Sequence, residues 1–157
     1  MASAFFHGWI SLPSRGEVYL AHGVPRRVWV PKDAAPDAEA LCDEIATLSG
    51  LRVTVSAWEA SEDPGALEAG VQVDPSDIGE VLRRLAHAAA ADFYDRYHKT
   101  LDAGDTDFGD AAYAQDLGVA LDCCHLTWEQ CRDADELRAQ YQQALRADCE
   151  AMARGSH

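Results

Sequence analysis

Residues 4–30 read AFFHGWISLPSRGEVYLAHGVPRRVWV, and the periodicity of this stretch decides the fold class. In residues 4–12 aromatic and β-branched side chains alternate, which predicts a strand with both faces partly covered. Pro13-Ser14-Arg15-Gly16 is typical of a turn, so residues 17–22 are expected to return as the second strand of a hairpin. Residues 26–30 predict a third strand.

The period changes to that of a helix after this hairpin. Residues 37–49 carry three apolar side chains at helical spacing: Leu41, Ile45 and Leu48. Asp37 is a suitable N-cap, and Gly50 can adopt the left-handed conformation that ends many helices. We therefore expect one helix between Asp37 and Gly50.

Alternation returns after the helix. Residues 51–58 predict a fourth strand, residues 61–70 a polar loop, and residues 71–73 a short edge strand. The resulting order β-β-β-α-β, with tight turns between the first strands, favours a mainly antiparallel sheet over residues 4–75.

The remainder of the chain, residues 76–154, predicts about three packed helices. Residues 76–101 keep a 3-4 apolar spacing over several turns, and residues 113–124 form a shorter apolar stripe. Thr127-Trp128-Glu129-Gln130 matches a capping box, so a last helix is expected to follow it. The chain is thus expected to be one α+β domain over residues 1–157.

The net charge of −14 limits the classes of partner. Nucleic acid and anionic membranes would both be repelled, so neither is expected to bind directly. A basic protein or a nucleoprotein complex is compatible with this charge, although solubility alone also explains it. Five cysteines without a recognisable signal peptide favour free thiols in the cytoplasm.

The excess charge is concentrated in residues 102–136, which hold ten acids and one base, Arg132. Carboxylates spaced along helices can occupy the basic groove of a nucleic-acid-handling protein in place of phosphates, with aromatic side chains as anchors. The predicted partner-binding residues are Asp102, Asp105, Asp107, Asp110, Asp116, Phe108, Tyr113 and Trp128.

The same stretch is a poor match to a metal site. Counting Asp105 as the first position of a calcium loop places Gly109 at a ligand position and Asp110 where the sharp turn needs glycine. Cys123-Cys124-His125 lacks the two-to-four-residue ligand spacing of zinc sites. We therefore expect neither a metal nor another cofactor.

Four side chains of the sheet-rich half could line a ligand pocket: His7, Trp9, Trp29 and Trp58. Packing in the core is the alternative explanation for these aromatic residues. A cysteine–histidine nucleophilic pair also remains open, because sequence cannot place the two side chains relative to each other. No catalytic residue is assigned.

The segment Phe6-His7-Gly8-Trp9-Ile10 resembles the first strand of some small immunity proteins of bacterial polymorphic-toxin systems. These are acidic α+β inhibitors of a toxin domain. The resemblance covers five residues of 157, and it implies a cytoplasmic, non-enzymatic protein that binds and blocks one toxin. It suggests His7 and Trp9 as candidates for functional residues.

These observations favour a small acidic binding protein that inhibits or sequesters a basic partner. The partner could be a toxin nuclease, as for an immunity protein, or a nucleic-acid-handling defence complex, as for a phage-type inhibitor. The alternatives are a small enzyme or ligand-binding domain with an aromatic-lined pocket, and a structural subunit of a larger assembly whose oligomeric state the sequence does not give.

Overall fold

The structure is a computed structural model that describes residues 6–34, 37–102, 108–131 and 134–155. It divides the chain into two compact units. The first spans Met1–Asp77 together with Cys123–His125, and the second spans Ile78–Asp122 and Leu126–His157. That the two units form one folding domain stays a prediction.

The first unit contains a six-stranded antiparallel sheet in the order β1-β2-β3-β6-β4, with β5 pairing β6. Its strands are β1 (Gly8–Ser11), β2 (Glu17–Ala21), β3 (Val24–Pro31), β4 (Val53–Val55), β5 (Glu59–Ala60) and β6 (Ala66–Val73). The predicted hairpin is confirmed by the pairing of Trp9 with Tyr19 and of Ser11 with Glu17. The predicted α+β class with a mainly antiparallel sheet is confirmed.

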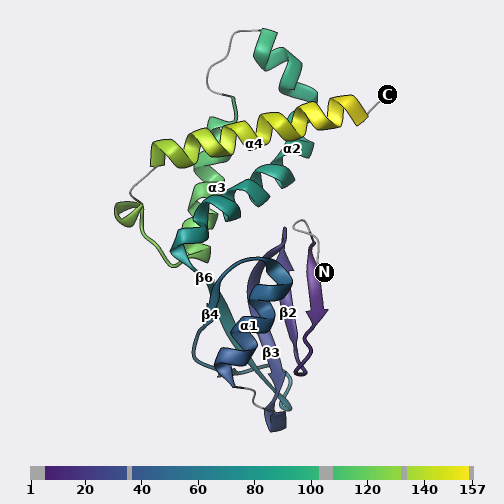
Figure 1. The fold of residues 1–157 in the computed structure, drawn as a ribbon, viewed down its shortest axis with the longest axis vertical. Coiled ribbons are helices and arrows are strands. Elements are labelled where there is room, and N and C mark those ends of the chain that lie inside the picture. Colours follow the sequence, from purple (N-terminus) through teal and green to yellow (C-terminus); the bar gives the residue numbers. More distant parts are fainter. Residues whose placement is uncertain (1–5, 35–36, 103–107, 132–133, 156–157) are drawn as a thin grey trace. The chain divides into compact units, whose positions relative to one another are not determined.

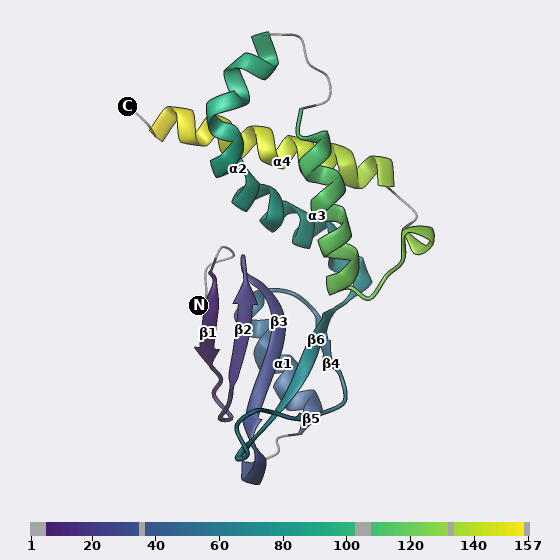
Figure 2. The ribbon, with the colours of Figure 1, turned by 180° about the vertical axis from the view of Figure 1, so that it is seen from behind.

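The helix α1 (Ala38–Ser49) covers one face of this sheet, which Figures 1 and 2 show from opposite sides. Both predicted caps are present: Asp37 accepts from the Glu39 N–H, and Gly50 has φ 74°. The apolar side of α1 packs onto the sheet. The core cluster comprises Leu12, Val18, Leu20, Val28, Val30, Leu41, Ile45, Ala69 and Val71.

The predictions of a polar loop at residues 61–70 and of a short edge strand at residues 71–73 were both wrong in part. These residues contribute the eight-residue strand β6, which lies between β3 and β4 in the sheet and is not an edge strand. It contains Glu68 and Gly70, residue types with low strand propensity. Pairing with β3, for example Val28 with Ala69, overrides this local preference.

The second unit is helical, as predicted, with α2 (Ile78–Asp102), α3 (Asp110–Cys123) and α4 (Ala134–Gly155). The helices α2 and α4 pack along each other. Phe108 and Tyr141 are buried in the helical unit, and the Phe108 ring contacts Phe93 and Tyr97 edge to face. Short 3-10 helices η1 (Lys32–Ala34), η2 (Pro75–Asp77) and η3 (Trp128–Gln130) complete the elements.

The capping box at Thr127 is present, but it does not begin the last helix of the chain. The box closes only η3, and α4 begins at Ala134. The reciprocal hydrogen bonds of a capping box satisfy the first turn of any helix, so they do not determine its length. Cys131 is already extended, with ψ 104°, and ends the turn.

Candidate functional site

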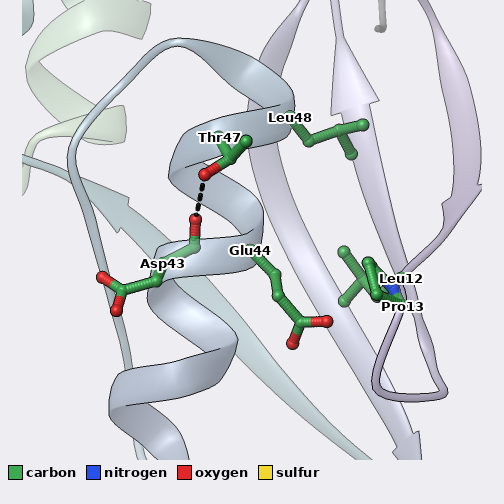
Figure 3. A pocket seen from close by; sticks show the side chains of 6 residues that line it. All are labelled: Leu12, Pro13, Asp43, Glu44, Thr47 and Leu48. Carbon is green, nitrogen blue, oxygen red and sulfur yellow. Dashed lines mark hydrogen bonds between the residues drawn. The ribbon is translucent and has the colours of Figure 1, made fainter.

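A pocket of about 400 Å³ opens on the surface between α1 and the turn that joins β1 to β2. In Figure 3, Glu44 and Leu48 lie on the side of α1 that faces Leu12 and Pro13. The spacing explains this geometry, because residues four apart on a helix share one face. The pocket is lined by Leu12, Pro13, Asp43, Glu44, Thr47 and Leu48.

The turn beside the pocket is fixed by local sequence. The Leu12 N–H donates to the Gly16 carbonyl at 2.9 Å, and Gly16 has φ 97°. A Cβ at Gly16 would lie 2.4 Å from the Trp29 carbonyl oxygen, so only glycine fits there. The backbone N–H and the hydroxyl of Ser14 both donate to the Glu44 carboxylate, at 2.7 and 2.5 Å. These charge-assisted bonds hold the turn onto α1.

The exposed surface of α1 carries only negative charge. The helix contains Glu39, Asp43 and Glu44 and no lysine or arginine, and Asp37 caps its first turn. Glu39 and Asp43 are exposed and four residues apart, so their carboxylates lie on one side of the helix. Within the described residues, no ion pair to either carboxylate is present.

This combination suits a side chain that is both apolar and cationic. Leu12, Pro13 and Leu48 provide an apolar surface, and the carboxylates of Asp43 and Glu44 stand on α1 around it. The aliphatic stem of a lysine or arginine can lie against apolar side chains while its charged head meets carboxylates. The site can therefore bind an amphipathic cation, and it contains no assigned catalytic group.

Two acids predicted to face a partner form contacts inside the helical unit instead. Asp110 accepts hydrogen bonds from Arg138, with a distance of 3.0 Å from Nε to Oδ1, and from Gln142. Asp116 accepts from the hydroxyl of the fully buried Tyr141 at 2.5 Å. These carboxylates join α3 to α4, and their predicted contact with a partner stays a prediction.

The three predicted aromatic anchors differ in their exposure to solvent. Phe108 and Tyr113 are 2% and 8% exposed and belong to the helical core, whereas Trp128 is 61% exposed. Apolar residues at helical spacing suit a core as well as an interface, and sequence does not separate the two. Asp105, Asp107 and the side chain of Asp102 lie outside the described residues.

The aromatic residues predicted to line a pocket lie on two faces of the sheet. His7 and Trp9 form an exposed cluster with Tyr19, whose hydroxyl lies 2.7 Å from His7 Nε2. Trp29 lies on the same face, because strand residues two apart share a face and Arg27 pairs with Tyr19. Trp58 packs against the core cluster that α1 covers. The four predicted side chains therefore do not surround one cavity.

Three of the described thiols, those of Cys42, Cys124 and Cys149, are poorly suited to nucleophilic chemistry. Burial, with the nearby Cys123, Asp74 and Asp77, raises the pKa of Cys124 to about 12. Burial also raises the pKa values of Cys42 and Cys149 above the ordinary value for a thiol. Because the thiolate is the nucleophilic form, these three side chains remain in their unreactive state near neutral pH.

Sequence reasoning missed the α1 pocket because its walls come from segments about thirty residues apart, with Ser14 bonded to Glu44. One signal was present in the sequence: residues 37–49 contain four acids and no base. That signal was obscured by the denser acidic stretch at residues 102–136.

Comparison with protein-family models, curated proteins and solved structures finds no match to this chain. In the part of the chain that the structure describes, no helix combines the length and apolar character needed to cross a membrane. The same residues contain no cluster of three or more histidine, cysteine or acidic side chains placed to hold a metal ion. Function is therefore inferred from the chemistry of the surface.

Proposed function

We propose that this chain is a binding protein that captures a basic partner protein at the α1 pocket and thereby inhibits or sequesters it. The observation that carries the proposal is the apolar pocket beside a helix whose charged residues are all acidic. The net charge of −14 supports the same function. A cytoplasmic location is part of the proposal.

The α1 site supplies both a pocket for an anchor residue and peripheral charges that guide association. An arginine or lysine of the partner enters the pocket as an anchor and loses its contact with water, which concentrates binding energy in one residue. Asp37 and Glu39 lie outside the pocket, Asp43 lines it, and all three carboxylates attract the partner as it approaches. Such peripheral charges mainly raise the association rate and fix the orientation of the complex.

A toxin nuclease or a nucleic-acid-handling defence complex fits this description of a partner. Such proteins bind phosphates through basic grooves, and an acidic helix can occupy the groove by offering carboxylates at similar intervals. An immunity protein and a phage-type inhibitor would both act in this way. The resemblance of residues 6–10 to immunity proteins agrees with the first of the two.

Site-specific photo-cross-linking tests the proposal. A photoreactive phenylalanine analogue at Thr47, an exposed residue that lines the pocket, is compared with the same analogue at the exposed Ala114 on α3. In lysate of the native host we expect Thr47 to capture one protein with a basic surface, and capture to fall as salt screens the charges. Capture from Ala114 but not from Thr47 would place the interface on the helical unit.

A further inference from the structure

The strand β1 is one edge of the sheet, and its backbone shows which groups are available there. The Leu12 N–H donates to the Gly16 carbonyl, and the Phe6 carbonyl accepts from the Gly23 N–H. Along an antiparallel strand, successive residues direct their N–H and C=O groups to opposite sides. Trp9 and Ser11 therefore direct theirs away from β2, where no described residue pairs with them.

The strand β1 is only four residues long, but its edge lacks the other features that usually prevent pairing with another chain. Edge strands are commonly protected by charged side chains, proline or bulges. Residues 6–12 contain no proline, lysine, arginine or acid, and the pairing of β1 with β2 runs without a register shift. Phe6 and Trp9, two of the large apolar residues that remain exposed, are 36% and 44% exposed beside this edge.

Charge identifies the partner that this edge fits. Residues 6–31 contain one acid, Glu17, and three arginines, although the whole chain has a charge of −14. Two copies of such an acidic chain repel each other over most of their surface, and the repulsion is weakest at the β1 edge. A basic partner is attracted to the acidic surfaces instead. A second copy of the chain is therefore the occupant that the charge distribution favours.

We propose that β1 pairs antiparallel with β1 of a second copy and joins the two sheets into one. A two-fold axis at Ile10 lets each Trp9 exchange both outward backbone hydrogen bonds with Ser11 of the other copy. The same axis sets the two Ile10 side chains against each other. Because Ile10 already packs against the core cluster, the pairing extends that core across the junction.

Sedimentation equilibrium of the full chain tests the proposal from micromolar to near-millimolar concentration. The wild type should approach twice the 17.1 kDa mass of one chain. Trp9→Lys places a charge at the edge, and Ser11→Pro removes an outward N–H, so both should remain monomeric. Val119→Lys, on the exposed surface of α3, is the matched control and should dimerise like the wild type. Circular dichroism checks that each variant is folded.

The salt dependence of dimerisation is a second test, because it distinguishes the β1 dimer from a dimer held together by opposite charges. Screening the repulsion between the acidic surfaces should strengthen the β1 dimer as salt is raised. A wild type that stays monomeric at every concentration overturns the proposal. This holds even if the β1 edge pairs with a strand of a different protein. A dimer that salt weakens, or that both β1 variants leave intact, overturns it as well.

Discussion

Removing the Tyr141 hydroxyl should destabilise the helical unit more than removal of a comparable hydroxyl nearby. Tyr141 is completely buried, and its hydroxyl donates to the Asp116 carboxylate at 2.5 Å. Tyr141→Phe keeps the ring and its contact with Tyr113 but withdraws the donor from a carboxylate. A hydrogen bond to a charged group contributes about 1.5–3 kcal/mol, so the free energy of unfolding should fall by that amount.

Tyr113→Phe is the matched control. Its hydroxyl donates at 2.9 Å to the uncharged carbonyl of Ala134, and its ring is nearly buried too. Loss of a neutral hydrogen bond costs about 0.5–1.5 kcal/mol. Urea unfolding of the full chain, followed by the helical circular dichroism signal, measures both variants. Equal losses for the two would refute the assignment of Asp116 as a structural partner of Tyr141.

Three further outcomes are expected. In a thiol titration of the native chain, the partly exposed Cys131 should react before Cys124, and equal rates would contradict the burial of Cys124. Burial and the Asp116 hydrogen bond raise the pKa of Tyr141, so the contribution of its hydroxyl to stability should be constant below about pH 10 and fall at higher pH. The difference between the wild type and Tyr141→Phe in alkaline urea titrations measures this contribution. Gly109→Ala places a Cβ 2.6 Å from Leu145 at φ 78° and should lower the free energy of unfolding by about 2–4 kcal/mol. Gly118→Ala, whose Cβ meets no atom within 4 Å, should instead stabilise α3 by about 0.5–1 kcal/mol, and thermal melts measure both variants.

Local periodicity was sufficient to predict most of the fold. The hairpin, the capped helix α1 and the three later helices each carry their own signal within a few turns or residues. The strand β6 does not, because Glu68 and Gly70 are unfavourable in strands and become part of one only through pairing with β3. The periodicity of a single segment does not predict its pairing with a distant strand.

The acidic surface was harder to predict, since charge density does not reveal which carboxylates have internal partners. Asp110 and Asp116 belong to the dense acidic stretch, yet they bind Arg138 and Tyr141 of α4. The α1 carboxylates at Glu39 and Asp43 are fewer but exposed, and they stand beside an apolar pocket. Their neighbours across the pocket come from the β1–β2 turn, which only the fold brings close.

The association rate with the captured partner tests the central claim most directly. Glu39→Lys combined with Asp43→Lys is compared with Asp92→Lys combined with Asp95→Lys, a pair of exposed acids on α2 that gives the same change in net charge. At low salt the α1 pair should slow association about tenfold or more, and the α2 pair should slow it much less. Equal slowing by the two pairs, or an unchanged rate for the α1 pair, would contradict binding at the α1 pocket.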